Sequence, residues 1–210
     1  ITGVTMPITK CNYIVEHADQ VADVMREAFA IARSGRPGPV LIDILKNATA
    51  EEADYEPLKR HLHHTEGRLG ALIARASHDL RAPEPDINDI EKLVDMINAS
   101  ERPMLICGGG VVRSRAHVEF EEFANRIDAP VAITLMGGGG FRGRNPLTTG
   151  MIGMHGSQAS NMAADACDLL IAFGCRFSDR VALDPKSFAA QAKIVHVDID
   201  RSEINKNVQT

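Results

Sequence analysis

The sequence predicts an α/β fold built around a doubly wound parallel sheet, and two observations support this prediction. From residue 86 onward, short apolar runs alternate with amphipathic stretches in the order strand, helix, strand. The runs at 103–107 and 168–173 are bounded by glycine, proline or polar residues, as buried strands are. Units of this kind connect parallel strands through right-handed crossovers, so helices cover both faces of the sheet.

The first expected element is a helix over residues 19–33. Its apolar residues recur three and four positions apart and therefore share one helical face; they are Val21, Val24, Met25, Ala28, Phe29 and Ala32. Gly35 ends this helix. A mostly β-branched apolar run at 40–45 then indicates a buried strand. One helix and one strand cannot enclose a core, so we interpret residues 1–46 as the end of an incomplete α/β domain.

Residues 47–85 are expected to be an interdomain linker. Periodicity fades there and polar residues and prolines dominate. The stretch is long for a plain connection, so part of it, 69–78, is a candidate helix. His61, His63 and His64 cluster in this linker, but without cysteine or paired carboxylates nearby they indicate a solvated loop and not a metal site.

Residues 86–210 are expected to form a central domain of alternating elements. Apolar spacing predicts helices that begin after Asp86 and after Ser114 as an N-cap, and further helices over 156–166 and 188–191. Strands are expected at 103–107, 131–134, 168–173 and 194–199. We read the whole chain as part of a longer protein, because it opens without methionine.

Composition excludes several classes of function. The chain has 210 residues, 44% of them apolar, and a net charge of −5 with a pI of about 5.9, so it offers no basic stripe for nucleic acid. No apolar run approaches the roughly 20 residues that span a bilayer. Its four cysteines form no CxxC pair. These features favour a protein of the cytoplasm that binds neither nucleic acid nor membrane.

The residues that follow the expected strands point to a nucleotide-like ligand. In open parallel sheets, ligands bind at the carboxyl ends of the strands. Here those ends carry Gly108–Gly110, Thr134–Gly140, Gly174 with nearby arginines, and Asp198. Glycine lets backbone N–H groups approach a phosphate, although such a triplet can equally be a tight strand-to-helix turn. A GxGxxG fingerprint is absent, so an NAD site is not supported.

Several motifs resemble those of acetolactate synthases, also called acetohydroxyacid synthases, in their large catalytic subunit. They are GRPGP with VLIDI, ICGGG, ITLMGGGGF, GMIGMHG, AFGCRFSDRV and KIVHVDID, in this order. GMIGMHG and RFSDRV are the specific ones, since ICGGG and GRPGP recur among thiamine-diphosphate enzymes. The similarity covers nearly the whole chain apart from the linker. It implies the end of a pyrimidine-binding domain followed by most of a Rossmann-like central domain.

The resemblance implies that the central domain binds FAD, which does no net redox chemistry there. The matching positions are Arg36, Gly108, Gly109, Gly110, Thr134, Leu135, Met136, Ile152, Gly153, Met154, His155, Gly174, Arg176, Arg180, Val181, Asp198 and Ile199. Lys46, Asp179 and Arg180 match positions that border the substrate channel. The chain departs from the family at Ser178, where a second acid is usual, and at the loop from Gly137, where a bulkier residue is usual.

The implied reaction condenses two pyruvates, or pyruvate and 2-ketobutyrate, with loss of carbon dioxide in branched-chain amino acid biosynthesis. Thiamine diphosphate and Mg²⁺ serve the full-length enzyme, which forms dimers or tetramers and binds a small regulatory subunit. The catalytic glutamate and the magnesium motif match no residue of this chain, so we expect no catalytic residue here and no activity from these 210 residues alone. Alternatives are a relative of glyoxylate carboligase or pyruvate oxidase, or a stand-alone nucleotide-binding or assembly module.

Two residues are interpreted as structural. His196 stands mid-strand between valines and is expected to be a hydrogen-bonded core residue. Cys175 follows a strand next to Arg176, but no histidine or acid pairs with it in sequence, so we expect an inert thiol.

Overall fold

The computed structural model describes residues 1–54 and 84–210, and the chain divides into two compact units, Ile1–Pro83 and Glu84–Thr210. The division falls at the end of the segment expected to be a linker, 47–85. The candidate helix at 69–78 and the histidines His61, His63 and His64 lie outside the described residues. Among the residues described, no helix is long and apolar enough to cross a membrane.

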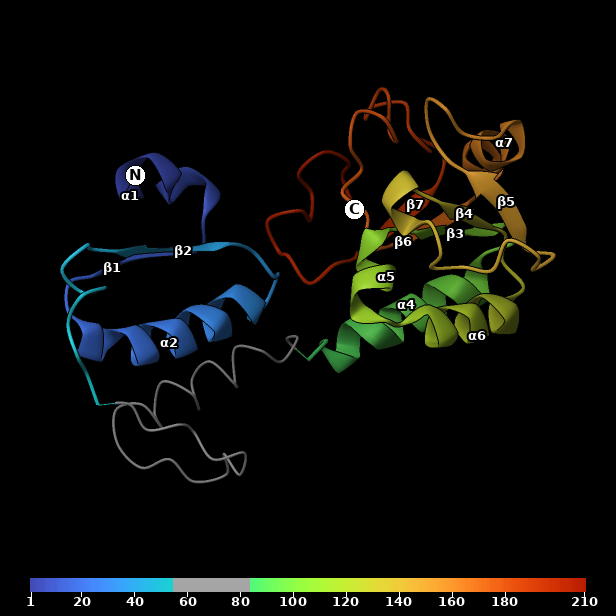
Figure 1. Ribbon diagram of the computed structural model, residues 1–210. Helices are drawn as coiled ribbons and strands as arrows, with labels where there is room; N and C mark the ends of the chain where they lie inside the picture. The colour runs from blue at the N-terminus through green and yellow to red at the C-terminus, as the bar shows by residue number, and fades with distance from the viewer. Residues whose placement is uncertain (55–83) are drawn as a thin grey trace. The chain divides into compact units, whose positions relative to one another are not determined.

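The first unit is a parallel β-α-β arrangement (Figure 1). Its elements are α1 (Thr2–Thr5), the 3-10 turn η1 (Met6–Ile8), β1 (Cys11–Val15), η2 (Ala18–Gln20), α2 (Val21–Arg33) and β2 (Val40–Ile44). Cys11 pairs with Val40 and Val15 with Ile44. The helix α2 runs along one face of the two strands and α1 lies on the other. The predicted helix is confirmed, and the strand after it ends one residue earlier than expected.

Two expectations for this unit are wrong. Sequence reasoning missed β1, because its residues mix cysteine, asparagine and tyrosine with only a short apolar end. The strand β2 was expected to be buried, but its residues are half-buried or exposed. The apolar stripe of α2 is likewise only partly covered, since Ala28 is buried while Phe29 is 64% exposed.

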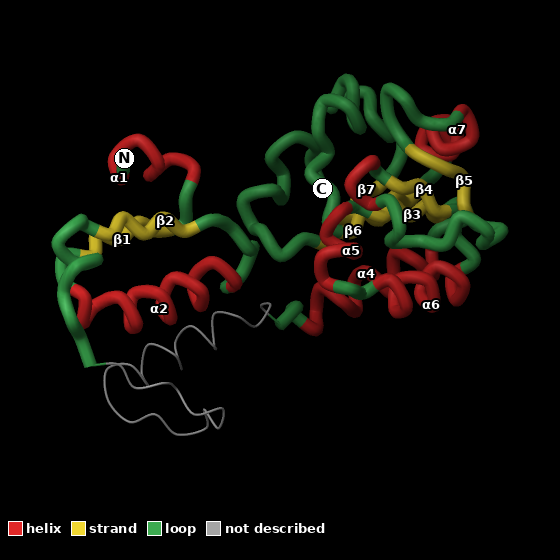
Figure 2. Tube along the Cα trace, viewed as in Figure 1, coloured by secondary structure: helices red, strands yellow, loops and turns green. Residues whose placement is uncertain are grey.

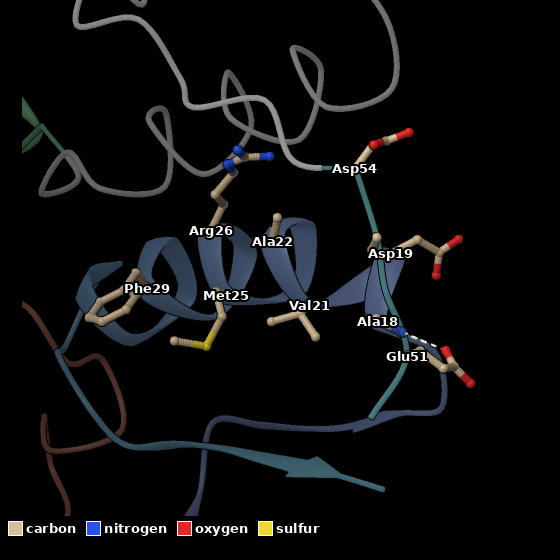
Figure 3. A pocket seen from close by; sticks show the side chains of 10 residues that line it. Ala18, Asp19, Val21, Ala22, Met25, Arg26, Phe29, Glu51 and Asp54 are labelled. Carbon is tan, nitrogen blue, oxygen red and sulfur yellow. Dashed lines mark hydrogen bonds between the residues drawn. The ribbon is translucent and has the colours of Figure 1, made fainter. Parts of the chain in front are cut away.

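An open hollow of about 550 Å³ lies along α2 and residues 51–54 (Figure 3). Phe29 lies at the end of the hollow away from Glu51. The Ala18 N–H donates to Glu51 Oε2 at 3.0 Å, and this bond, together with Asn47 and His17, lowers the pKa of the Glu51 carboxyl. Glu51 therefore ties the chain after β2 to the start of η2.

The second unit is a five-stranded parallel sheet with helices on both faces. The helices are α4 (Ile87–Ala99), α5 (Gly109–Ser114), α6 (His117–Ile127) and α7 (Gln158–Ala166), with the 3-10 turn η3 (Leu135–Gly137). The strands are β3 (Pro103–Cys107), β4 (Val131–Ile133), β5 (Thr148–Met151), β6 (Leu169–Phe173) and β7 (Lys193–Val197). Their order is β5-β4-β3-β6-β7, with every neighbouring pair parallel. The doubly wound α/β fold is therefore confirmed (Figures 1 and 2).

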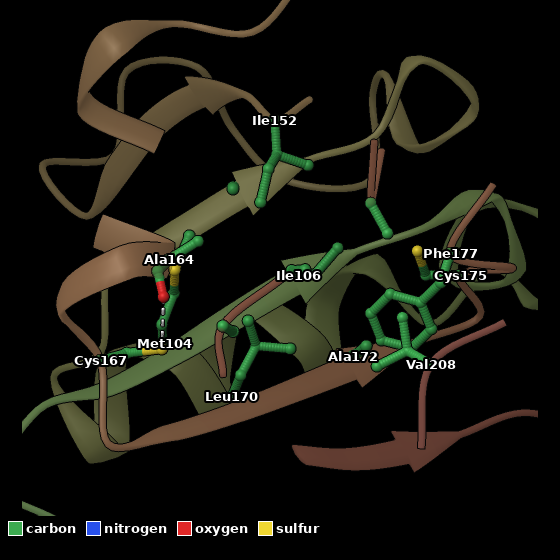
Figure 4. Packing of buried hydrophobic residues seen from close by; sticks show 13 residues of the cluster. Met104, Ile106, Ile152, Ala164, Cys167, Leu170, Ala172, Cys175, Phe177 and Val208 are labelled. Carbon is green, nitrogen blue, oxygen red and sulfur yellow. Dashed lines mark hydrogen bonds between the residues drawn. The ribbon is translucent and has the colours of Figure 1, made fainter. Parts of the chain in front are cut away.

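Each face of this sheet has its own hydrophobic core, because side chains alternate along the strands. Met104, Ile106 and Leu170 face a cluster that α7 and the loops after β6 complete (Figure 4). Leu105 and Ile171 face the opposite cluster, which α4 and α6 cover. In the second cluster the Phe120 ring meets Phe173 edge-on with centroids 5.3 Å apart. β3 and β6 are thus buried on both faces, as their continuous apolar sequences predicted.

Several element boundaries differ from the prediction. Ser114 does not cap a helix; it is the last residue of α5, and its hydroxyl donates to Gly110 O at 2.9 Å. Residues 188–191 form turns and not a helix, with Ala189 at φ +47°. The strand expected at 194–199 is β7, which spans 193–197. The strand expected at 131–134 is β4, which ends one residue earlier because Thr134 caps η3.

Sequence reasoning also missed β5 and placed the start of α7 two residues too early. β5 has the sequence TTGM, which carries almost no apolar pattern, and its Gly150 has φ +105°. The helix α7 begins only after Ser157, whose hydroxyl accepts a hydrogen bond from the Ser160 N–H. Such a side-chain cap satisfies an N–H group that the first helical turn leaves without a partner.

Asp168 fixes the amino end of the sheet. Its carboxylate accepts hydrogen bonds from the Ser100 hydroxyl and from the N–H groups of Glu101 at 2.8 Å and Arg102 at 3.0 Å. The Ser100 bond, with the two N–H donors, lowers the pKa of this carboxyl to about 2. One side chain at the start of β6 therefore holds the turn between α4 and β3.

Glycine is required where β3 passes into α5. A Cβ on Gly108 would lie 2.1 Å from Gly174 O, and one on Gly110 would lie 2.5 Å from Gly174 Cα. Gly174 itself has φ +57°, a conformation that residues with a Cβ rarely adopt. The backbones after β3 and β6 therefore touch directly.

Replacing Gly110 with alanine tests this contact. We expect Gly110→Ala to lower the free energy of unfolding by about 1–3 kcal/mol or more, because the added methyl group collides with backbone that cannot rotate away. Gly143→Ala is the matched control, since nothing lies within 4 Å of the added Cβ there. Urea denaturation measures both. Equal stability of the two variants would contradict the requirement for glycine.

Candidate functional site

The candidate site is the carboxyl edge of the five-stranded sheet. The chain leaves β3 toward β4 on one side and later returns to place β6 on the other side. At such a reversal of strand order the flanking loops diverge, and the edge outside the carboxyl ends is where open α/β sheets bind ligands.

Backbone hydrogen bonds join the residues just after each strand along this edge. The Ile152 N–H donates to Ile133 O, and the Thr134 N–H donates to Cys107 O, both at 3.0 Å. Gly108 N donates to Phe173 O and Gly174 N to Val197 O, both at 2.8 Å. The loops predicted from sequence to hold a ligand are therefore brought together as one continuous rim, in the order of the strands.

The sequence left two interpretations of the glycine triplet open, N–H groups that approach a phosphate or a tight strand-to-helix turn. In the structure Gly108 N donates to Phe173 O, and Gly110 N donates to Gly174 O at 3.0 Å. Both groups are thus hydrogen-bonded within the protein. Gly109 begins α5 and lies against Met136, whose Cβ would be 3.0 Å from a Cβ at this position. The tight strand-to-helix turn, considered above as the alternative, describes Gly108 and Gly110.

Residues 134–137 present apolar side chains at the rim. Thr134 is buried, and its hydroxyl accepts from the Gly137 N–H at 3.1 Å. This cap turns the chain so that Leu135 and Met136 project outward, 79% and 61% exposed. Two large apolar side chains are therefore exposed next to each other at the rim.

The loop from Ile152 to His155 lies against the segment from Ser178 to Val181. Ile152 is buried in the core, whereas Met154 is 46% exposed and His155 is exposed. The Met154 N–H donates to Arg180 O at 2.9 Å, and Arg180 Nη1 lies 3.8 Å from Met154 Sδ. A cationic fork and a soft apolar side chain are therefore presented together.

The remaining predicted residues of this unit follow β6 and β7. Arg176 is exposed, and its carbonyl accepts from the Asn207 side chain at 2.9 Å. Asp198 is largely buried and accepts from the Asp200 N–H at 2.9 Å, while Ile199 is 42% exposed. Asp179 lies 3.9 Å from Arg180 Nε, and because both side chains are exposed, this ion pair adds little stability. The rim thus carries two guanidinium groups and two carboxylates.

Arg36 and Lys46 belong to the other unit. Arg36 follows α2 and Lys46 follows β2, and both are exposed. They are therefore described separately from the rim residues, which lie in the second unit.

Sequence reasoning missed one side chain that shapes the rim. Asn161, in the first turns of α7, forms two hydrogen bonds to the backbone of Gly153. A lone asparagine among small helical residues gave no signal, because its partner is a backbone group eight positions away.

His196 was expected to be a hydrogen-bonded core residue. It is buried beneath the rim, but the expected hydrogen bond is not found among the described residues. Its side chain is fully buried, its ring meets Phe177 edge-on with centroids 5.0 Å apart, and Nε2 is 3.7 Å from Asp198 Oδ2. Among the described residues neither ring nitrogen has a hydrogen-bond partner. Burial lowers the pKa of His196, and the Asp198 carboxylate opposes this shift without cancelling it. The imidazole is therefore neutral at pH 7.

Cys175 is a poor nucleophile. The side chain is 3% exposed, and burial raises the pKa of its thiol to about 11, so the thiolate is scarce at neutral pH. This agrees with its interpretation as an inert thiol.

Comparison with known proteins connects this rim to a family. Residues 90–210, more than half of the chain, match the family described as thiamine pyrophosphate enzyme, central domain. The chain belongs to the thiamine pyrophosphate enzyme family. The stretch that matches contains the whole sheet and every predicted site residue except Arg36 and Lys46.

Several acetolactate synthase large subunits are similar to this chain over nearly its whole length. The chain is 43% identical to the acetolactate synthase large subunit of Cyanidium caldarium over 99% of its own length and 34% of that protein. It is 44% identical to the probable acetolactate synthase large subunit of Methanocaldococcus jannaschii, over 99% of this chain and 33% of the relative. The chain therefore spans about a third of the length of these relatives.

Solved structures of other proteins share this fold. Benzoylformate decarboxylase from Polynucleobacter necessarius superposes with a TM-score of 0.72 at 20% identity, covering 96% of this chain and 35% of that one. A putative thiamin diphosphate-dependent enzyme from Mycobacterium smegmatis gives the same TM-score at 23% identity, covering 96% of this chain and 36% of the other. At this identity the likeness establishes the fold.

The buried imidazole of His196 predicts how stability depends on pH. Its pKa in the folded protein lies below the ordinary value of 6.5, so the unfolded chain takes up a proton first as the pH falls. We expect the free energy of unfolding to decrease from about pH 7 to about pH 5 and this decrease to be smaller in His196→Phe. Denaturant titrations at several pH values measure it. The exposed residue His117 provides the control His117→Gln. If both variants kept the wild-type slope, His196 would not be its source.

Proposed function

We propose that this chain is part of an acetolactate synthase, which condenses two pyruvates, or pyruvate and 2-ketobutyrate, with loss of carbon dioxide. One observation carries the proposal: proteins named acetolactate synthase, most of them large subunits, are 38–44% identical to this chain over 97–100% of its length. The similarity includes the first unit, which lies outside the family match at 90–210.

We propose further that the rim binds FAD, and its side chains suit that molecule. Leu135, Met136 and Met154 offer exposed apolar contacts for a flat ring system. Arg176 and Arg180 offer guanidinium groups whose paired N–H donors match pyrophosphate oxygens. Asp198 retains acceptor capacity for ribose hydroxyls beside its bond to Asp200. Bound FAD would provide a rigid surface for the rim loops. It would transfer no net electrons in the reaction.

The other predicted contacts support this arrangement indirectly. Gly153 and Gly174 adopt positive φ and let the loops approach one another. Thr134 and Ile152 are buried and hold the loops that carry the exposed residues. His155 and Ile199 are exposed at this edge, and Val181 is half-buried and packs against the core beneath it. Arg36 would contribute from the other unit.

The proposal for the whole enzyme extends beyond the described residues. Thiamine diphosphate and Mg²⁺ would act in the full-length protein, with Lys46, Asp179 and Arg180 bordering the path of an anionic 2-ketoacid. The designation of several relatives as large subunits supports a catalytic subunit that forms an oligomer and binds a small regulatory partner. The cytoplasmic location stays a prediction, since the tobacco and rice relatives are named chloroplastic.

A titration of the 210-residue chain with FAD, followed by flavin fluorescence, tests the cofactor proposal. We expect saturable binding that weakens about tenfold or more in Arg180→Ala, because one charge-assisted contact is lost. Gly109→Asp should weaken binding further, since it places a carboxylate beside Met136, one of the proposed apolar contacts of the ring system. Arg126→Ala on the exposed side of α6 is the control and should bind like wild type. Equal affinity in all four proteins would contradict the proposed contacts.

Turnover tests the reaction. The full-length protein with thiamine diphosphate, Mg²⁺ and FAD is expected to convert pyruvate to acetolactate, measured as acetoin after acid decarboxylation. The 210-residue chain under the same conditions should produce none. Turnover of glyoxylate but not pyruvate would favour a glyoxylate carboligase, and acetolactate formed by the short chain would refute the predicted inactivity.

A further inference from the structure

The loop between β5 and α7 carries Met154 in a conformation that its own sequence does not enforce. Gly153 has φ +104°, and a Cβ there would lie 2.1 Å from Arg180 O. Glycine permits this conformation but also permits many others. Something else in the fold must select it.

Asn161 makes that selection. Its side-chain oxygen accepts from the Gly153 N–H at 3.0 Å, and its side-chain nitrogen donates to Gly153 O at 3.1 Å. The two bonds hold the peptide groups on either side of the Gly153 Cα, so together they restrict both of its backbone torsions. The orientation of the amide is unambiguous, because one partner can only donate and the other can only accept.

The helix makes Asn161 a rigid support. Ser157 caps α7, and its hydroxyl also donates to Thr149 O at 2.6 Å. Ser160, fully buried, lies 2.9 Å from the Thr149 hydroxyl and 3.0 Å from that of Ser157. The two Ser157 bonds attach the start of α7 to β5 whether or not residue 160 carries a hydroxyl group, so the Asn161 side chain starts from a fixed position.

Holding Gly153 also fixes the backbone of Met154, the next residue, which lies on the rim. With Gly153 held, the Met154 N–H meets Arg180 O at 2.9 Å, and the Met154 sulfur lies 3.8 Å from the Arg180 guanidinium. Gly153 O also accepts from the Gly156 N–H at 2.8 Å, which closes the loop on itself. Asn161 is half-buried, and both of the hydrogen bonds that its side chain makes to described residues join it to the Gly153 backbone.

We propose that Asn161 is a positioning residue for flavin binding, which fixes the backbone of Gly153 and thereby presents Met154 and Arg180 together to the cofactor. This inference rests on the proposed binding of FAD at the rim. An amide of this length is required. Aspartate lacks the donor and would place a carboxylate against Gly153 O, and alanine makes neither bond.

The test compares Asn161→Asp and Asn161→Ala with Ser160→Ala in the full-length protein. Ser160→Ala removes buried hydroxyl bonds from the same helical turn but leaves both Asn161–Gly153 hydrogen bonds, which we call the Gly153 clamp. This variant therefore reports the loss of stability alone. FAD affinity is measured by flavin fluorescence well below each melting temperature. We also record the visible absorption spectrum of the bound flavin, which responds to the contacts of the ring system.

We expect both Asn161 variants to bind FAD about tenfold or more weakly and to shift the flavin spectrum, because the loop is released. Ser160→Ala should lower the melting temperature yet stay within about threefold of wild-type affinity with an unchanged spectrum. Asn98→Asp, on the exposed side of α4, controls for the added charge.

Three results would overturn the inference. Asn161 variants that bind FAD like wild type would show that the clamp does not position the site. Ser160→Ala weakening FAD as much as Asn161→Ala would show that Asn161 acts only through stability. If Asn161→Asp failed to fold, the comparison would rest on Asn161→Ala. Absence of FAD binding by the wild-type protein would refute the proposed cofactor itself, a result distinct from the first two.

Discussion

The direct backbone contact between Gly108–Gly110 and Gly174 is the constraint on which the central unit depends. It lies where the two most buried strands, β3 and β6, end side by side, and no side chain separates the two turns. Because Gly110 N donates to Gly174 O and Gly174 N donates to Val197 O, the contact also fixes where β7 ends relative to β3. A bulkier residue here would push the carboxyl ends apart and disturb the rim that they form.

This close packing changes how the glycine-rich turn after β3 is interpreted. Glycine after a strand is often taken as a sign that backbone N–H groups face a phosphate. Here the N–H groups of Gly108 and Gly110 donate to Phe173 O and Gly174 O, and the exposed side chains of this edge come from adjacent loops. The exposed residues Leu135, Met136 and Met154 and the guanidinium of Arg180 are held outward by a buried Thr134, by Ile152 and by the Asn161 clamp.

Fold and reaction separate clearly in this family. A benzoylformate decarboxylase shares the fold at a TM-score of 0.72 and 20% identity, whereas acetolactate synthase large subunits share up to 44% of the residues. The sheet is therefore a frame that proteins with different names and reactions can share. Met154 and Arg180 meet across two loops at its carboxyl edge.

Sequence alone determined the elements whose pattern is local. Continuous apolar runs identified β3 and β6, because a strand buried on both faces is apolar at every position. Helical spacing identified α2 and α4, because a helix buried on one side is apolar at every third or fourth position. Short motifs such as GMIGMHG indicated the family. The sequence did not reveal β1 or β5, whose half-covered residues leave little apolar pattern. Nor did it reveal that Ser114 ends a helix and does not begin one, or that the N–H groups of Gly108 and Gly110 donate to Phe173 O and Gly174 O. It also did not reveal that the His196 ring has no hydrogen-bond partner among the described residues. Those outcomes required the tertiary structure, because each depends on a partner distant in sequence. The clamp of Asn161 on Gly153 is of the same kind, since a side chain and a backbone conformation acquire their roles only when the fold brings them within hydrogen-bonding distance.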